Sequence, residues 1–413
     1  MYRAVIVVVV VAVALVIPGC NSGSANPELT VKSKPAPSAP QAQSTPQPQP
    51  PPHRAPGDAS ADADLTGLAG KPLYLALCAP CHGAEGKGYV ADRAPSLVNP
   101  TFLESASDEF LRRAIVAGRP GTSMAAYSKA MGGPLDDAGV GSLVAFLREQ
   151  GPPQRPLPPP SIGDLATGSA VYAKHCFNCH GDAKTRGEAP SLANQVFQAT
   201  ATAAFVRHAV VAGRPGTKME AFTAKLSDTE IDSVVSYVRG LGSGGVPMPS
   251  LLAEPTGKEP IVIHPSGKHP SFTPRAETCP PPMAGAPPCK PEPRFVSVEQ
   301  VGKALAAKQR MVIIDARPPS EWMRVHITGA VSIPYHDMKR LDEVPKDGTW
   351  VIAYCGCPHH LSGIVVDELR KRGYAHAVVL DEGINEWHRR GLPVVAAEGV
   401  TAPPEVMMPQ PRR

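Results

Sequence analysis

The sequence predicts a multidomain protein in which two all-α domains precede one α/β domain with a mostly parallel sheet, joined by Pro-rich linkers. Three observations lead to this fold class. With 413 residues, the chain is too long for a single hydrophobic core. Its 49 prolines gather in a few stretches that cannot bury enough apolar surface to fold alone. Between them, one region repeats its own motifs in helical surroundings, and a later region alternates Val- and Ile-rich runs with helical segments.

The Pro-rich stretches set the expected boundaries. The helical domains are expected at residues 65–151 and 164–243, and the α/β domain at residues 294–398. The remaining parts are a signal peptide, linkers and a disordered tail, at residues 1–20, 21–64, 152–163, 244–293 and 399–413.

The N-terminal segment predicts export. Arg3 precedes an apolar run at residues 4–17 that is too short to span a bilayer comfortably and is typical of a signal peptide. The run ends in Ile-Pro-Gly-Cys and resembles a bacterial lipoprotein signal, which would leave Cys20 as a lipid-modified N-terminus. An ordinary secretory signal or an uncleaved anchor is the alternative. Each version places the rest of the chain in the periplasm or another extracytoplasmic space, and the lipid anchor would add contact with a membrane.

The charge pattern argues against nucleic acid as a partner. The formal net charge is only +4, and the chain has no dense Lys/Arg run with interleaved aromatic residues. Partners are therefore expected among proteins and small molecules.

Two CxxCH motifs carry the first chemical signal. The motif cysteines and histidines are Cys78, Cys81 and His82, and Cys176, Cys179 and His180. Two thiols at this spacing can alkylate the two vinyl groups of one porphyrin, and the following imidazole then lies under the iron. Disulfides or zinc ligands are the alternative. Because the histidine follows the second cysteine in both copies, the spacing favours two covalently bound haem c groups.

The repeat continues beyond the cysteines. Pro-Ser-Leu and Gly-Arg-Pro-Gly-Thr recur in the same order in both copies, and a methionine follows each second block, Met124 and Met219. Each methionine lies about 40 residues beyond its histidine, where its thioether could close over the opposite face of the haem. Met131 competes with Met124 in the first copy, but the second copy has Leu226 at the corresponding position.

Helix signals surround both motifs. Ser107 is expected to cap a helix that stops at Gly118, and Ser227 forms a capping box with Glu230. Phe146 and Tyr237 lie on the last helix of each copy and are expected to pack against the first helix. His175 and His208 have no counterpart in the other copy and are expected on the surface.

These motifs resemble tandem class I cytochromes c. The resemblance covers about two fifths of the chain. It implies two haems that carry single electrons, with iron held by His82 and Met124 and by His180 and Met219. Partners would be redox proteins of an extracytoplasmic electron-transport chain.

The C-terminal region predicts an α/β fold. Ser297 with Gln300 caps a helix, and four short apolar runs at residues 311–315, 330–333, 350–354 and 377–380 alternate with helical segments. Cys355 follows the third run directly and precedes a helix expected at residues 362–372. A cysteine between a strand end and a helix N-terminus favours the thiolate, and the same backbone donors would bind an oxyanion such as thiosulfate.

The region resembles a rhodanese domain. The resemblance rests on Ile313-Ile314-Asp315-Ala316-Arg317, on His326-Ile327-Thr328-Gly329-Ala330, on the loop cysteine and on Leu380-Asp381-Glu382-Gly383-Ile384 with Trp387. It implies that Cys355 accepts sulfane sulfur as a persulfide, from thiosulfate or a persulfide donor. Asp315, Arg317 and His326 would then be supporting groups.

The loop after Cys355 departs from that family. It is one residue longer than usual and contains no arginine, so His359 and His360 are candidates for the missing positive charge. Cys357 has three interpretations: a resolving thiol, one half of a permanent disulfide, or a metal ligand together with Cys355 and the two histidines. Cys279 and Cys289, in the last linker, are expected to form a structural disulfide.

These observations predict an exported dihaem electron carrier fused to a sulfur-handling domain. Whether that domain is a sulfurtransferase stays open. An electron-transfer protein with an inactive docking domain is the alternative. A third class, thiosulfate oxidation at a haem, usually needs a cysteine-ligated or open iron, and the sequence indicates no such cysteine.

Overall fold

The structure is a computed structural model that describes residues 65–242, 251–277, 291–356 and 359–403. These residues all belong to one compact unit, Gln49–Arg413. The predicted signal peptide with Cys20, the linker at residues 21–64, Cys357, and the predicted pair Cys279 and Cys289 lie outside the described residues.

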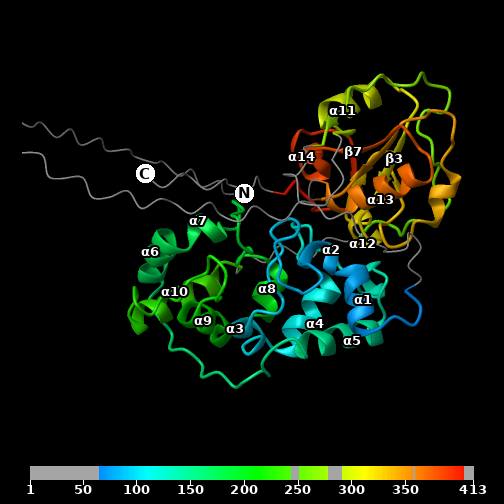
Figure 1. Ribbon diagram of the computed structural model, residues 1–413. Coiled ribbons are helices and arrows are strands. Elements are labelled where there is room, and N and C mark those ends of the chain that lie inside the picture. The colour runs from blue at the N-terminus through cyan, green and yellow to red at the C-terminus, as the bar shows by residue number, and fades with distance from the viewer. Residues whose placement is uncertain (1–64, 243–250, 278–290, 357–358, 404–413) are drawn as a thin grey trace, which may run out of the picture. The chain divides into compact units, whose positions relative to one another are not determined.

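The first module, residues 65–151, is helical, as predicted (Figure 1). Its helices are α1 (Gly70–Leu77), α2 (Ala79–His82), α3 (Pro100–Leu103), α4 (Asp108–Ala117), the 3-10 turn η1 (Lys129–Met131) and α5 (Asp137–Arg148). The second module, residues 164–242, repeats this order without the 3-10 turn. Its helices are α6 (Leu165–His175), α7 (Phe177–His180), α8 (Gln195–Thr200), α9 (Ala203–Ala212) and α10 (Asp228–Gly240).

Local capping explains where these helices begin. The Ser107 hydroxyl accepts a hydrogen bond from the Phe110 amide, and α4 ends at Gly118, whose φ of 63° favours glycine. Ser227 and Glu230 form the predicted capping box at the start of α10. The predictions for both helix starts are confirmed.

The first and last helices of each module pack against each other through aromatic rings. The Tyr74 and Phe146 ring centroids are 5.1 Å apart, and those of Tyr172 and Tyr237 are 5.3 Å apart. The expected positions of Phe146 and Tyr237 are thus confirmed.

The C-terminal α/β domain is built on a sheet with strand order β1-β2-β7-β6-β3-β5. All neighbouring strands in it are parallel except the antiparallel pair β1 and β2. Its strands are β1 (Arg275–Ala276), β2 (Pro293–Val296), β3 (Val312–Asp315), β5 (Val331–Ser332), β6 (Val351–Tyr354) and β7 (Ala377–Leu380). A separate antiparallel pair consists of β4 (Val325–Ile327) and β8 (Val394–Ala396).

Helices accompany this sheet, and α13 packs on β6 and β7. The helical elements are α11 (Val298–Ala306), α12 (Pro319–Trp322), the 3-10 turn η2 (Lys339–Glu343), α13 (His360–Lys371) and α14 (Gly383–Arg389). Strands β3, β6 and β7 are buried at every position, as expected for a parallel sheet. Each predicted strand contains an observed one, and Ser297 caps α11 as expected.

Part of the predicted linker at residues 244–293 is structured with the α/β domain. The Ile263 amide donates to the Met311 carbonyl at 2.8 Å, and Phe272 lies in the hydrophobic core with 9% of its surface exposed. Strand β1 also comes from this segment. Within the part of the chain that the structure describes, no helix is long and apolar enough to cross a membrane.

The surface prediction for two histidines is wrong in one case. His208 is buried, and its Nε2 lies 2.7 Å from the Glu104 carboxylate on the first module. This partner is distant in sequence, so the local pattern gave no sign of it. His175 is half-buried beside the Phe222 ring.

Candidate functional site

The two CxxCH motifs occupy equivalent positions in the two modules. In each module the first cysteine links the first helix to a one-turn helix that ends with the motif histidine. No disulfide joins the cysteines within either motif. Among the described residues, no group of three or more His, Cys, Asp or Glu side chains is arranged to hold a metal ion.

Each motif histidine is oriented by a proline carbonyl. The Nδ1 of His82 lies 2.9 Å from the Pro95 carbonyl oxygen, and that of His180 lies 2.8 Å from the Pro190 carbonyl oxygen. A carbonyl oxygen only accepts, so Nδ1 carries the proton and Nε2 keeps its lone pair for a metal. Burial lowers the pKa of both imidazoles, which favours the neutral form that ligates iron.

This donor set fits a covalently attached haem. Each module offers two thiols for the porphyrin vinyl groups and one imidazole whose second nitrogen is already fixed. The repeated Pro-Ser-Leu block supplies the orienting carbonyl in both copies, which explains why this block recurs in the sequence.

The methionine loops of the two modules have the same hydrogen bonds. The Met124 amide donates to the Thr122 hydroxyl at 3.1 Å, and the Arg119 amide donates to the Met124 carbonyl at 2.8 Å. In the second module, the Met219 amide likewise donates to the Thr217 hydroxyl at 3.1 Å, and the Arg214 amide donates to the Met219 carbonyl at 2.7 Å. The Gly-Arg-Pro-Gly-Thr block thus builds one type of loop twice, each time carrying the candidate methionine ligand.

Cys355 lies at the carboxyl end of the buried strand β6. Its Sγ is 3.3 Å from the Ser362 hydroxyl, which belongs to the first turns of α13. The backbone around it is held by α14: the Ile384 amide donates to the Cys355 carbonyl at 3.1 Å, and the Asn385 amide group donates to the Gly356 carbonyl at 2.9 Å. This is the position at the end of a parallel strand where ligands of α/β folds bind. Only 1% of Cys355 is exposed.

Arg317 is held by acidic and carbonyl groups below this loop. Its guanidinium donates to both Asp315 oxygens, at 2.9 and 2.7 Å, and to the Val325 carbonyl at 2.6 Å. The Tyr354 hydroxyl adds a 2.8 Å bond to Asp315. His326 stacks on Trp322, with 3.8 Å between the ring centroids. These contacts fix the positions of Asp315, Arg317 and His326, and their supporting role stays a prediction.

The loop histidines have different surroundings. The Nε2 of His359 lies 2.6 Å from Asp381, and its ring packs on Phe295. The His359 side chain is thus engaged by a carboxylate, which reduces its capacity to act as the loop's free positive charge. His360 is the first residue of α13. Cys357, the third member of the predicted loop set, is outside the described residues, so its three interpretations stay predictions.

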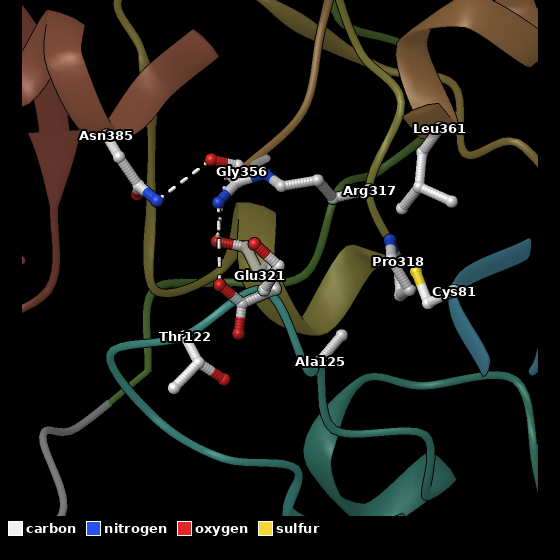
Figure 2. Close-up of a pocket in the computed structure, with 10 residues that line it drawn as sticks. Cys81, Thr122, Ala125, Arg317, Pro318, Glu321, Gly356, Leu361 and Asn385 are labelled. Carbon is white, nitrogen blue, oxygen red and sulfur yellow. Dashed lines mark hydrogen bonds and ion pairs between the residues drawn. The ribbon is translucent and has the colours of Figure 1, made fainter. Parts of the chain in front are cut away.

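The first module contacts the loop that follows Cys355. A narrow cavity of about 20 Å³ is lined by Cys81, Thr122, Ser123 and Ala125 from the first module and by Arg317, Pro318, Glu321, Gly356, Leu361 and Asn385 from the α/β domain. Figure 2 shows residues of both domains around this cavity. Burial, followed by the charge of Cys355, raises the pKa of the Cys81 thiol to about 12. The sequence predicts separate sites for these two cysteines, one in an attachment motif and one at a strand end.

One difference between the two copies of the repeat marks this contact in the sequence. The residue before the methionine is Ser123 in the first module and Lys218 in the second, although the preceding five residues are identical. The small residue faces Gly356, whereas Lys218 pairs with Glu188 at 2.9 Å in an exposed position.

Three family models match the chain. "Cytochrome c" matches residues 68–151, "Cytochrome C oxidase, cbb3-type, subunit III" matches residues 163–238, and "Rhodanese-like domain" matches residues 297–390.

Curated relatives match the same two parts. The cbb3-type cytochrome c oxidase subunit FixP of Bradyrhizobium sp. strain ORS 278 is 30% identical over 200 residues, which cover 45% of this chain and 66% of that subunit. A sulfurtransferase of Allochromatium vinosum is 33% identical over 105 residues, which cover 25% of this chain and 96% of that protein. The chain thus spans just under two thirds of the length of the oxidase subunit.

Solved structures give weak overall matches. A rhodanese-like domain from Anabaena sp. is 22% identical, with 30% of this chain and 94% of that chain covered and a TM-score of 0.25. Reduced cytochrome c4 from Pseudomonas stutzeri is 19% identical, with 41% of this chain and 96% of that chain covered and a TM-score of 0.16.

Proposed function

Because the chain carries two cytochrome c domains followed by a rhodanese-like domain, we propose that it is a dihaem electron carrier that accepts sulfane sulfur on Cys355. The observation that carries this proposal is the repeated attachment geometry, two thiols and one oriented imidazole in each module, on the same chain as a cysteine at a strand end.

The modules hold the haems through matched residues. Cys78 and Cys81 would attach the first haem, and His82 and Met124 would ligate its iron. Cys176 and Cys179 would attach the second haem, and His180 and Met219 would ligate its iron. When bound, a haem with histidine and methionine ligands supplies a carrier for single electrons. The protein's part is to fix the imidazole through Pro95 and Pro190 and to shape the methionine loops.

The α/β domain supplies the sulfur acceptor. The Cys355 thiolate attacks the outer sulfur of a donor such as thiosulfate, the S–S bond of the donor breaks, and sulfite leaves with the bonding electron pair. The product is a persulfide on Cys355, with no net electron exchange with the haems. Ser362, 3.3 Å from Sγ, can donate to the thiolate, and the start of α13 favours negative charge.

The proposed setting is extracytoplasmic. Covalent haem attachment and the predicted signal peptide favour the periplasm, with Cys20 as a lipid anchor. Redox proteins of an electron-transport chain would be the partners, by analogy with the oxidase subunits whose cytochrome domains are similar.

A second function, electron transfer with an α/β domain that only docks, is favoured by two observations. The loop contains no arginine, and His359 is engaged by Asp381. A protein with this second function would bind both haems in the same way, but its Cys355 would accept no sulfur.

The haem content is tested on the exported protein. Pyridine haemochrome absorption with intact-mass measurement should give two haems per chain, and replacing both cysteines of one motif by serine should leave one. A chain that matures without covalent haem would overturn the electron-carrier assignment.

Sulfur acceptance is tested by cyanolysis. After incubation with thiosulfate and removal of the excess, wild type should release about one thiocyanate per chain when cyanide attacks the persulfide, and Cys355→Ser should release none. Ser227→Ala, at the cap of α10 in the second module, serves as a control that should match wild type. Equal release from wild type and Cys355→Ser would favour the docking function instead.

A further inference from the structure

The loop between the attachment histidine and the orienting proline is longer in the first module than in the second. His82 and Pro95 are 13 residues apart, whereas His180 and Pro190 are 10 residues apart. In each module an alanine amide, at the same distance along the chain from the histidine, donates to the carbonyl of the second motif cysteine. The three additional residues of the first module therefore lie after this contact, at residues 92–94.

The additional residues form a turn with an unusual backbone. The backbone angle φ is 42° at Asp92 and 55° at Arg93, and Tyr89, at the start of the turn, has a φ of 62°. The Tyr89 amide closes the turn by donating to the Ala94 carbonyl at 2.6 Å. Residues other than glycine are uncommon in this left-handed region and cost conformational energy there, so such a backbone persists where other contacts hold it.

One such contact is an ion pair with the second module. The Arg186 Nη2 donates to an Asp92 carboxylate oxygen at 3.1 Å, and only 16% of the arginine side chain and 22% of the aspartate side chain are exposed. In the pair of Lys87 with Glu85, by comparison, 77% and 73% are exposed. Because water and salt screen a partly buried pair less, the Asp92 pair is the stronger restraint.

Both members of this pair belong to loops that pack directly on an attachment motif. Asp92 follows the alanine whose amide donates to the Cys81 carbonyl at 3.3 Å. Arg186 precedes Gly187, where an added Cβ would be 2.1 Å from the Cys179 carbonyl oxygen. The ion pair therefore joins the two haem-attachment segments through a short run of backbone on each side.

The same turn also reaches the methionine loop of the second module. The Tyr89 side chain is hydrogen-bonded to Thr217. The Thr217 hydroxyl in turn accepts a hydrogen bond from the Met219 amide at 3.1 Å. The turn of the first module therefore contacts both haem-binding segments of the second module.

This contact runs in one direction only. The first module has Gly88 where the second module has Arg186, and the second module has no counterpart of Asp92. A feature that both copies shared could follow from duplication of one module. The Asp92–Arg186 pair is instead specific to the tandem arrangement.

We propose that the Asp92–Arg186 pair is a brace that fixes the two haem-attachment segments relative to each other. Both residues would then be positioning residues for electron exchange between the modules, because such exchange depends on the separation and orientation of the two redox groups. In that exchange one haem loses a single electron and the other gains it, so neither a proton nor a further reactant is needed. The proposal rests on the proposed function in taking both modules as haem carriers.

The experiment uses Soret circular dichroism of the oxidised, full-length protein. Two haems held in a fixed geometry couple their transitions, so the wild-type spectrum should contain a couplet that is missing from the sum of the two single-haem variants. Asp92→Asn should weaken this couplet, because it removes the charge but keeps a residue that tolerates the left-handed backbone. A wild-type spectrum equal to the sum would overturn the brace.

Variants of the arginine separate the charge from the side chain. Arg186→Gln should weaken the couplet in the same way, whereas Arg186→Lys keeps a positive charge and should retain most of it. Hydrogen exchange of peptides covering residues 182–189 should quicken about threefold in Asp92→Asn and Arg186→Gln, the factor expected from a partly exposed ion pair. Equal losses in Arg186→Lys and Arg186→Gln would contradict a role for the charge.

The matched control breaks an ion pair inside the second module. Arg207 pairs with Asp232 at 2.7 Å, with 26% and 14% of the two side chains exposed, so Arg207→Gln removes a contact of similar burial. It should leave the couplet and the exchange of residues 182–189 at the wild-type values. Unchanged couplets and exchange rates in Asp92→Asn and Arg186→Gln would overturn the proposal.

Failure of the brace is distinguishable from failure of the proposed function. Pyridine haemochrome absorption gives the haem content of each variant independently of the couplet. A wild-type chain with fewer than two haems would contradict the electron-carrier assignment. The hydrogen-exchange comparison needs no haem signal, so it would still decide whether the ion pair holds the two attachment segments together.

Discussion

Asp315 and Arg317 form a buried ion pair beneath the sulfur loop. Neither side chain is more than 5% exposed, and the shortest N–O distance is 2.7 Å. Arg310 and Asp347 form a pair with the same 2.7 Å distance, but the Asp347 side chain is 48% exposed. The two pairs share the same shortest distance, but the Asp315 pair is more deeply buried and has two bonds where the Asp347 pair has one, so the loss of its carboxylate should cost more.

We expect Asp315→Asn to destabilise the α/β domain by about 3 kcal/mol, because it removes the nearest counter-charge of a buried guanidinium and leaves only the more distant Glu321 carboxylate, at 3.4 Å. Urea unfolding followed by tryptophan fluorescence measures this domain alone, since Trp322, Trp350 and Trp387 all lie within it. Asp347→Asn should leave the unfolding midpoint almost unchanged, because water solvates the remaining charge. Similar shifts for both variants would show that the buried pair contributes no more than the exposed one.

His336 makes the α/β domain sensitive to acid. Burial lowers its pKa to about 4, and its Nε2 has no hydrogen-bond partner among the described residues. Between pH 6.5 and pH 4 the unfolded chain binds a proton that the folded state excludes. Stability is therefore complete above pH 6.5 and is lost as the pH falls toward 4, by roughly 3 kcal/mol from this residue.

His336→Gln should flatten the pH dependence of unfolding between pH 6.5 and pH 4, with tryptophan fluorescence as the measure. His269→Gln, at an exposed position, is the matched control and should retain the wild-type slope. An unchanged slope in His336→Gln would assign the acid sensitivity to other groups.

Helix starts are the elements that sequence predicts best. Ser107, Ser227 and Ser297 each accept a hydrogen bond from an amide three residues later, so the signal and the structure lie within one turn. The attachment motifs and the methionine loops are predictable for the same reason, because each is a short block repeated in order. A feature whose interacting residues lie close together in the sequence can be predicted from the sequence.

We expect Ser227→Ala to destabilise the second module by about 1 kcal/mol through loss of the cap on α10. Thermal unfolding followed by the Soret absorption of the haem-loaded protein measures the change. Thr229→Ala, at an exposed position in the first turn of the same helix, should have little effect. A larger loss from Thr229→Ala than from Ser227→Ala would contradict the role of the cap.

Elements that depend on distant partners were not predictable. Strands β4 and β8 are short and pair across nearly seventy residues of chain, so neither carries a strong pattern of its own. Residues 251–277 are rich in proline and were expected to be linker, yet Ile263 and Phe272 contact the core. The burial of these two side chains depends on the sheet that they cover, so the proline-rich composition of the segment could not indicate it.

In the whole molecule, the two modules exchange a reciprocal pair of contacts. The Asn99 amide donates to the Pro215 carbonyl, and the Asn194 amide donates to the Pro120 carbonyl, both at 2.9 Å. Each asparagine lies shortly after the Pro-Ser-Leu block of one module, and each proline lies in the methionine loop of the other. Like the meeting of Ser123 with Gly356, this arrangement joins loops that are individually recognisable in the sequence, whereas their pairing is decided only by the assembled fold.

The two reciprocal asparagine–proline hydrogen bonds predict that the modules stabilise each other. Asn194→Asp keeps the side-chain oxygen that accepts from the Val196 and Phe197 amides, but it replaces the donor facing Pro120 with a second acceptor. We expect a loss of about 2 kcal/mol, because a buried hydrogen bond becomes a repulsion. Differential scanning calorimetry of the haem-loaded protein measures it.

The control is Asp136→Asn, an isosteric exchange at the cap of α5, whose recorded bond is to Gly139 within the first module. It should shift the transition little. Asn99→Asp should reproduce the effect of Asn194→Asp from the other side. Because both bonds belong to one contact, the double variant should lose less than the sum of the single losses. Strict additivity would mean that the two bonds act independently, whereas transitions unchanged in both single variants would mean that the modules do not stabilise each other through this contact.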